Sequence, residues 1–187
     1  MKKLLTILCL LILSSYSYSE DVSWDQLVKR EGIFYKINSD QPFTGTTVDY
    51  HENGQLEGSG NFKNGKEHGL KETYYENGQL KWRINYNNGK QEGLWEEFDE
   101  DGKPTKTGEY KDGKQLSETT FTYHRNHQLK KRENYKDGHR DGLWEWFHKN
   151  GQLKKRKNYK DGHRDGLWEW FHKNGQLKKR VDYKKGV

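Results

Sequence analysis

The chain has 187 residues, enough for one domain or one short array of repeats. Hydrophobic residues make up 29% of it and charged residues 33%, with a net charge of +6, and the mean hydropathy of -1.35 excludes a large aliphatic core. Aromatic residues reach 14% and there are only two prolines, which favours a folded chain with a thin core of Trp, Tyr and Phe over a disordered one.

Residues 1–19 are predicted to be a secretory signal peptide. Two lysines precede the apolar run Leu4–Leu13, and Ser17 and Ser19 place small residues at the two positions that specify cleavage. The run is too short for a retained membrane helix. We therefore expect cleavage near Ser19 and an exported chain, periplasmic or secreted. Because the single cysteine, Cys9, lies in this segment, the mature chain is expected to have no disulfide.

Residues 20–44 do not follow the repeat that begins after them, and we expect them to form an N-terminal cap. Ser23-Trp24-Asp25-Gln26 is compatible with a helix start that has a capping box, and Ile33–Ile37 is predicted to be a strand. Because an open sheet edge invites aggregation, this segment is expected to cover the first edge of a sheet.

From residue 45 onward the sequence repeats with a period of 24 residues. The clearest case is NYKDGHRDGLWEWFHKNGQLKKR, which occupies 134–156 and again, letter for letter, 158–180. Each unit is numbered here from its opening glycine, which Glu118 replaces in the fourth unit, and the third unit has one extra residue near Leu116. The six units are 45–68, 69–92, 93–117, 118–141, 142–165 and 166–187.

Each unit is predicted to consist of two strands joined by hairpin turns. Aromatic residues recur at positions 6 and 18, and leucine recurs at position 12 and, in four units, at position 2. Asn-Gly and Asp-Gly dipeptides recur at positions 9–10 and 20–21, as is typical of hairpin turns. A three-residue loop with a left-handed glycine would pair position 6 with 12 at the first turn and 18 with 22 at the second. We predict this loop at both turns, because it places positions 2, 6, 12 and 18 on one face.

The predicted fold class is therefore all-β. We expect an open, extended antiparallel β-meander of about six 24-residue hairpin repeats, with a short N-terminal cap that includes the possible helix start. Each unit would contact mainly its neighbours, so that stability accumulates along the array.

Two segments, GLWEEFDEDGKPTKTGEYKDGK and GLWEWFHKNGQLKKRKNYKDGH, resemble the MORN-repeat variant found in the bacterial YwqK-type antitoxin family. The resemblance extends from Phe43 to the C-terminus, and the PFTG at Pro42–Gly45 is similar to exported members. It implies a glycine-punctuated antiparallel sheet and a binding protein that neutralises a toxin partner.

The odd positions of the last two units carry the predicted binding surface. We expect cations and indoles to alternate there, with Arg156 opposite Trp144 and Lys154 opposite Trp146. Exposed cation–indole contacts are worth roughly 0.5–1 kcal/mol, so this surface either covers a single-layer sheet or recognises a partner. The predicted partner-binding residues are Trp144, Trp146, Lys154, Arg156, Trp168, Trp170, Lys178 and Arg180.

Charge is distributed unevenly along the chain. From Glu118 onward 19 Lys/Arg stand against 9 Asp/Glu, a net charge of +10, whereas residues 20–117 hold 13 against 19, a net charge of -6. The basic half is expected to meet an anionic partner, either an acidic protein or an anionic envelope lipid or polysaccharide. Export argues against nucleic acid, and a solvated strand face with no partner is the alternative.

No catalytic, cofactor or metal site is expected. The glycines fall at turns rather than in a phosphate-binding loop, and the histidines recur in register without the spacing of a known metal site. Asp99–Gly102 lacks most ligands of a calcium loop. We therefore expect an exported, non-enzymatic, antitoxin-like protein-binding module. The alternative is an envelope-associated structural protein that adheres to anionic lipid or polysaccharide.

Overall fold

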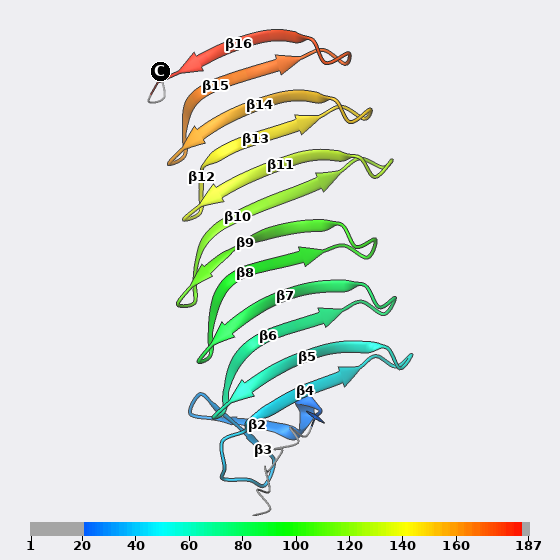
Figure 1. Ribbon diagram of the computed structural model, residues 1–187, viewed down its shortest axis with the longest axis vertical. Coiled ribbons are helices and arrows are strands. Elements are labelled where there is room, and N and C mark those ends of the chain that lie inside the picture. The colour runs from blue at the N-terminus through cyan, green and yellow to red at the C-terminus, as the bar shows by residue number, and fades with distance from the viewer. Residues whose placement is uncertain (1–20, 185–187) are drawn as a thin grey trace, which may run out of the picture.

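The computed structural model describes residues 21–184, which form one long, open β-sheet and a small two-stranded sheet at its N-terminal end (Figure 1). The large sheet has 14 strands and does not close into a barrel. This confirms the predicted open all-β meander. The predicted signal peptide, 1–19, lies outside the described residues. Within 21–184, no helix is long and apolar enough to cross a membrane.

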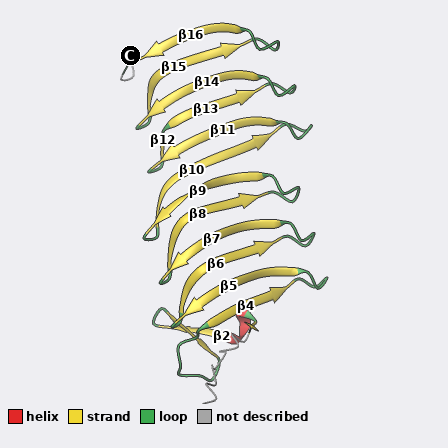
Figure 2. Cartoon of the chain, in the orientation of Figure 1, coloured by secondary structure: helices red, strands yellow, loops and turns green. Residues whose placement is uncertain are grey.

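The strands of the array follow one another in chain order, and neighbouring strands are antiparallel (Figure 2). The exception is the two-residue strand β12 (His139–Arg140), which pairs only with the strand before it. The strands of the array are β4 (Gly45–Tyr50), β5 (Leu56–Lys63), β6 (Lys66–Tyr74), β7 (Leu80–Asn87), β8 (Lys90–Phe98), β9 (Pro104–Lys111), β10 (Lys114–Tyr123), β11 (Leu129–Lys136), β12 (His139–Arg140), β13 (Gly142–Phe147), β14 (Leu153–Lys160), β15 (His163–Phe171) and β16 (Leu177–Tyr183).

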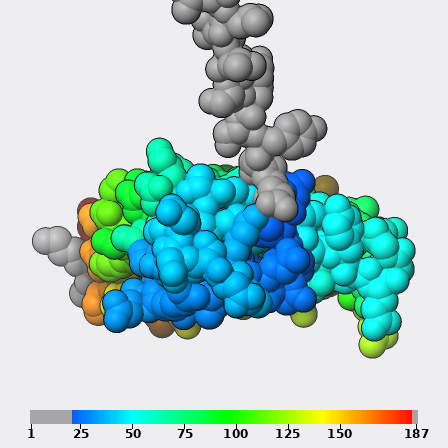
Figure 3. Space-filling view, turned by 90° about the horizontal axis from the view of Figure 1, so that it is seen from below, coloured from blue at the N-terminus to red at the C-terminus, as the bar shows by residue number. Residues whose placement is uncertain are grey.

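The N-terminal segment covers the first edge of the sheet. Its strand β1 lies parallel to β4, with Val22 opposite Thr47, and the blue residues lie across this end of the array (Figure 3). The predicted helix start forms a single 3-10 turn, in which the Ser23 N–H donates to Gln26 Oε1 at 3.1 Å. The elements of the segment are β1 (Asp21–Val22), the 3-10 helix η1 (Trp24–Gln26), β2 (Leu27–Arg30) and β3 (Ile33–Lys36).

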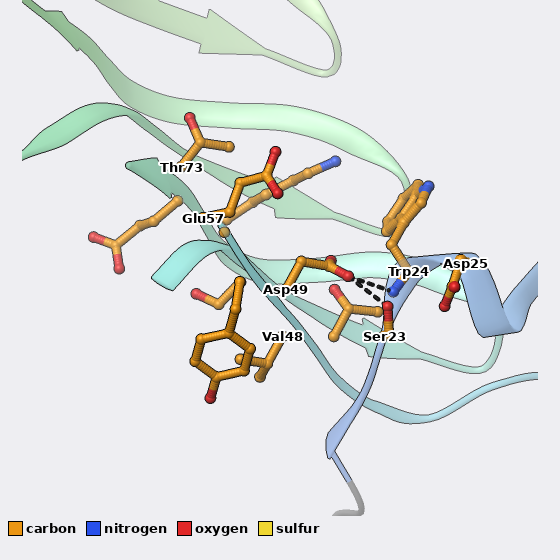
Figure 4. Close-up of a pocket in the computed structure, with 13 residues that line it drawn as sticks. Ser23, Trp24, Asp25, Val48, Asp49, Glu57 and Thr73 are labelled. Carbon is orange, nitrogen blue, oxygen red and sulfur yellow. Dashed lines mark hydrogen bonds between the residues drawn. The ribbon is translucent and has the colours of Figure 1, made fainter. Parts of the chain in front are cut away.

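Aromatic and polar contacts join this segment to the sheet. The ring of Phe62 has its centroid 5.3 Å from that of Phe34 and 5.6 Å from that of Trp24. The Asp49 carboxylate accepts the Ser23 hydroxyl at 2.6 Å and the Trp24 backbone N–H at 3.0 Å (Figure 4). The segment is therefore held by both a small apolar core and two hydrogen bonds to Asp49.

The first turn of each unit is the predicted three-residue loop. In the first unit, the His51 N–H donates to the Gln55 carbonyl at 2.8 Å, and Tyr50 lies opposite Leu56. Gly54, at position 10, has a φ of 82°, in the left-handed region that favours glycine. Position 6 therefore pairs with position 12, as predicted.

The second turn is a two-residue loop, so the predicted three-residue loop is wrong there. Lys63 lies opposite Lys66, and the intervening Asn64 and Gly65 have φ values of 51° and 70°. Positive φ at both central residues defines a type I′ turn, whose twist matches that of the flanking strands. A larger residue would also clash here, because a Cβ on residue 65 would lie 2.3 Å from Cγ2 of Ile33.

Every unit also contains a β-bulge at position 13. In the fifth unit, Phe147 lies opposite Leu153 and Trp146 opposite Lys155, which leaves Lys154 as the extra residue. One extra residue moves every later side chain of that strand to the other face. Positions 2, 6 and 12 therefore share one face, as predicted. The prediction that position 18 joins them is wrong, because it lies on the opposite face with positions 3 and 5.

The junction between β9 and β10 has a shifted register. Elsewhere position 16 lies opposite position 3 of the next unit, as Gly60 does with Lys71, but Gly108 lies opposite Glu118, at position 1. The extra residue of the third unit forms a bulge here. The Ser117 carbonyl oxygen comes so close that a Cβ at position 108 would lie 2.1 Å from it. Glycine at this position makes the shifted register possible.

Candidate interaction face

The bulges gather seven aromatic side chains of the last three units on one face, which we call the indole face. Trp144 and Trp168 alternate with tyrosines along the array, and successive ring centroids lie 5.1, 5.3, 5.3 and 4.8 Å apart. Both indoles are only 5% exposed. The aromatic residues of the face are Tyr135, Trp144, Trp146, Tyr159, Trp168, Trp170 and Tyr183.

The two buried indoles hold neighbouring strands together. Trp144 Nε1 donates to the Asn134 carbonyl at 2.7 Å, and Trp168 Nε1 donates to the Asn158 carbonyl at 2.9 Å. Each indole therefore buries its apolar surface with its one polar atom satisfied. Truncating such a residue typically costs about 3–5 kcal/mol, so these two tryptophans are primarily structural.

Cations lie over this aromatic row. Lys157 Nζ is 3.9 Å from the ring centroid of Trp168, and the Arg140 guanidinium carbon is 4.9 Å from that of Trp144. Lys155 Nζ is 4.2 Å from the centroid of the Trp146 ring. The cations of the indole face are Lys131, Arg140, Lys155, Lys157, Arg164 and Lys179.

Positive charge on this face is poorly balanced. Lys131 pairs with Glu133 at 2.6 Å, but within 21–184 none of the other five cations forms an ion pair with a carboxylate. Burial lowers the pKa of Lys155 and Lys157, and neighbouring cations lower both pKa values further. The indole face is therefore a partly dehydrated, positively charged surface supported by aromatic rings.

The opposite face carries an ion-pair ladder instead. Arg132 pairs with Glu145, and Glu169 lies between Arg156 and Arg180, with Arg180 Nη2 at 2.7 Å. The Glu169 side chain is 1% exposed. The hydrogen bond from Arg156 lowers the pKa of Glu169, assisted by Arg180 and opposed by desolvation. Charges on this face are thus paired within the protein.

The structure divides the predicted partner-binding residues among three places. The four tryptophans, Trp144, Trp146, Trp168 and Trp170, share the indole face. The two lysines, Lys154 and Lys178, are the extra residues of the bulges. The two arginines, Arg156 and Arg180, belong to the ion-pair ladder of the opposite face.

The predicted pairing of cations with indoles is therefore wrong by one residue. Arg156 does not lie opposite Trp144, and Lys154 does not lie opposite Trp146. Instead, Trp144 lies opposite Lys157, and Trp146 lies opposite Lys155. The bulge at position 13 is the physical reason, because it reverses the alternation of the strand that carries the cations.

Sequence reasoning missed the cations that lie opposite the indoles, because it did not include the bulge. The second unit contains a pattern that indicates this bulge. There Trp82, Ile84 and Tyr86 alternate with polar residues, which places positions 14, 16 and 18 on one apolar face, and Ile84 is 4% exposed. The alternation of Trp144 and Trp146 places positions 3 and 5 on an apolar face as well. The two patterns share one face only if a bulge separates them.

A hollow of about 640 Å³ lies where the N-terminal segment meets the sheet (Figure 4). Its lining includes Asp25, Asp49 and Glu57, and Lys71 Nζ lies 4.7 Å from the ring centroid of Trp24 at its side. Asp49 is already occupied by the hydrogen bonds that anchor the segment. Across the described residues, no group of three or more His, Cys, Asp or Glu is placed to hold a metal ion.

Comparison with known proteins identifies the repeat. No curated protein matches the sequence. Among solved structures, TarM is 14% identical with a TM-score of 0.28, covering 50% of this chain and 20% of that one. The GtfA/B complex bound to UDP and GlcNAc is 12% identical with a TM-score of 0.18, covering 89% and 27%. The chain thus spans about a fifth to a quarter of the length of these two proteins.

The model of the MORN repeat variant matches five segments, 43–64, 67–90, 91–112, 140–161 and 164–185. The stretch 113–139, between the third and fourth matched segments, contains most of the fourth unit. It includes the shifted register and Glu118 in place of the opening glycine. Because the matched segments together cover more than half of the sequence, the chain belongs to the MORN repeat variant family.

Proposed function

We propose that the chain is an exported, non-enzymatic protein-binding module, antitoxin-like, which captures an acidic partner through the indole face. The observation that carries this proposal is a set of five cations that lie over buried or partly buried aromatic rings. Within 21–184, none of these cations has a carboxylate partner. Membership of a family of repeat modules that generally bind proteins or lipids supports it.

The cost of the cation cluster supports binding over a purely structural role. Exposed cation–π contacts contribute about 0.5–1 kcal/mol each, but Lys155 and Lys157 are partly dehydrated and lie among other cations. An acidic partner would relieve this repulsion, whereas the arginines of the opposite face already have glutamate partners. The indole face is therefore the surface that gains most from a carboxylate brought by another molecule.

The duplicated units strengthen the same surface. The stretch that repeats letter for letter is preceded by Glu133 in the first copy and by Lys157 in the second. Glu133 pairs with Lys131, whereas Lys157 lies over Trp168 among cations. The exchange thus converts a neutralised part of the face into a basic one, next to the aromatic row.

Capture of a partner from extract of the chain's own cells tests this proposal. The tryptophans are unsuitable targets because two of them hold the strands together, so the cations are changed instead. One column carries the chain from residue 20, and a second carries Arg140→Gln, Lys155→Gln, Lys157→Gln and Arg164→Gln together. A third, matched for charge, carries four substitutions at exposed turn or bulge positions, namely Lys130→Gln, Lys149→Gln, Lys154→Gln and Lys173→Gln.

We expect an acidic protein on the first and third columns and its loss from the second. Equal loss from the second and third columns would mean that net charge, rather than the indole face, retains it. Retention on all three would show that another surface binds the partner, and the proposal would then be abandoned.

The alternative is an envelope-associated structural protein that adheres to anionic lipid or polysaccharide. It is favoured by the same five cations of the indole face, which have no carboxylate partner within 21–184. Such adhesion weakens as salt shortens the Debye length, to about 8 Å at physiological ionic strength. Binding of the chain to vesicles with anionic headgroups, measured across a salt series, tests it. Steep loss with salt and equal weakening in both four-residue variants would favour this alternative.

A further inference from the structure

At four of the five junctions between units, side chains at positions 7 and 9 donate hydrogen bonds to the backbone of the next unit. His51 and Asn53 donate to the carbonyls of Tyr74 and Glu76 at 2.9 and 2.7 Å, and the pattern recurs 23 residues apart at four junctions. We call these residues connector side chains. Those that donate are His51, Asn53, Tyr75, Asn77, His124, Asn126, His148 and Asn150.

The last described unit has the same two connector residue types, His172 and Asn174. Within 21–184, no carbonyl accepts from the side chain of His172 or from the amide nitrogen of Asn174, whose Oδ1 accepts the Gln176 N–H at 3.1 Å. The adjacent strand β16 pairs with β15, and no described strand pairs with its other side (Figure 1). A row of backbone groups and two side-chain donors therefore lie along the same edge.

The register inside the array specifies which strand would fit this edge. β14 presents Arg156 to Glu169 of β15, with the neighbouring Lys155 and Lys157 opposite Trp170 and Trp168. β16 presents Lys179, Arg180 and Val181 at the corresponding positions. An antiparallel strand that continues the pattern would thus place an acidic residue opposite Arg180, between two aromatic residues.

We propose that this edge binds an extended segment of a partner protein in which one acidic residue lies between two aromatic residues. The segment adds to the sheet antiparallel to β16. Backbone hydrogen bonds supply affinity and the alternating side chains supply specificity, as in other cases of strand addition. His172 and Asn174 donate to two carbonyls of the segment, and Arg180 pairs with its acid. The Arg180 side chain is 56% exposed, which leaves it accessible for a second carboxylate besides Glu169.

A second copy of the chain fits this edge less well. Two β16 strands paired edge to edge would bring Lys178, Lys179 and Arg180 of one copy against the same residues of the other. Like charges on neighbouring strands are destabilising, so the sequence of β16 opposes self-pairing and favours a strand that contains an acid.

This inference rests on the proposed function in taking the partner to be a protein, but it places the contact on a different surface. The probe is a labelled peptide, HRDGLWEWFHKNG, which has the sequence of residues 163–175 and hence the strand that fits β14. Its binding to the chain from residue 20 is measured by fluorescence anisotropy. We expect saturable binding, weakened about tenfold by Arg180→Glu. A peptide with Arg in place of its glutamate should recover binding to that variant.

Two further variants separate binding from folding. His172→Ala with Asn174→Ala removes two side-chain donors that have no described acceptor, together with the exposed bond from the Gln176 N–H to Asn174 Oδ1. It should therefore weaken binding of the peptide several-fold with only a small loss of stability. Lys154→Glu makes the same charge change as Arg180→Glu at an interior bulge and should bind normally.

Unchanged binding in both edge variants would overturn the inference, as would concentration-dependent dimerisation that Arg180→Glu abolishes. The four-residue indole-face variant should bind the peptide normally, so a failure here is distinguishable from a failure of the proposed function. Loss of peptide binding in that variant instead would mean that the peptide docks on the indole face, which also overturns the edge assignment.

Discussion

Replacing Glu169 with glutamine should destabilise the C-terminal units by about 2 kcal/mol. Loss of one partner from a fully buried ion pair costs about 3–5 kcal/mol, but the side chains of Arg156 and Arg180 are 42% and 56% exposed and can rehydrate. Glu145→Gln is the matched control, because its ion pair is with Arg132 alone, and its cost should be about half as large. Urea unfolding followed by tryptophan fluorescence measures both differences.

The stability difference between wild type and Glu169→Gln should depend on pH. The pKa of Glu169 is lowered from its ordinary value of 4.5, so its contribution to stability is complete above that value and is lost as the pH falls through the folded pKa. The difference in unfolding free energy between wild type and Glu169→Gln should therefore be constant near neutrality and shrink below about pH 4.5. A difference that persists undiminished at about pH 3, or one no larger than that of Glu145→Gln, would refute the reasoning.

Three further changes isolate single contacts. Gly65→Ala should cost about 1–3 kcal/mol more than Gly138→Ala in thermal or urea unfolding, because both have positive φ but only a Cβ at 65 meets other atoms within 4 Å. Asn150→Ala should cost about 1 kcal/mol more than Asn174→Ala, since Asn150 Nδ2 donates to the next unit at 3.0 Å; equal costs would exclude a role for this bond. Lys157 should react with an amine-directed acylating reagent faster than exposed lysines at mildly alkaline pH, because its pKa is lowered, as mass spectrometry of the peptides would detect.

Much of the fold was predictable because the repeat leaves few alternatives. The 24-residue period and the glycine dipeptides predict two strands per unit, and the requirement that positions 6 and 12 share a face predicts the loop at the first turn. The prediction of a three-residue loop at the second turn is wrong because it rests on placing position 18 on the face of positions 2, 6 and 12. In the structure Tyr159 and Tyr183 belong to the opposite face, with the indoles, because the bulge at position 13 reverses the alternation of their strands.

The candidate site was predictable only in part. The tryptophans identify their own face because Trp144 and Trp146 alternate with Glu145. The cations do not identify their face, because residues 154–157 are four consecutive Lys or Arg. Whether the even-numbered or the odd-numbered residues face the indoles, a cation lies opposite each indole. A bulge inserts one extra residue, and the position of that residue cannot be recognised in a run of four similar side chains. Only the alternation elsewhere in the array, as in Trp82 and Ile84, indicates where the bulge lies.

The shifted junction between β9 and β10 lacks the connector hydrogen bonds that the other four junctions have. The connector positions of the third unit are Asp99 and Asp101, whose carboxylates cannot donate to a carbonyl, and the strand register slips at the same place. Coupling between neighbours is what makes a repeat array unfold as one body, so we expect the array to divide at this junction if its two parts open separately. The acidic units and the basic units can then respond independently to force, denaturant or a bound ligand. A partner on the basic end would stiffen its own block and leave the other to fluctuate.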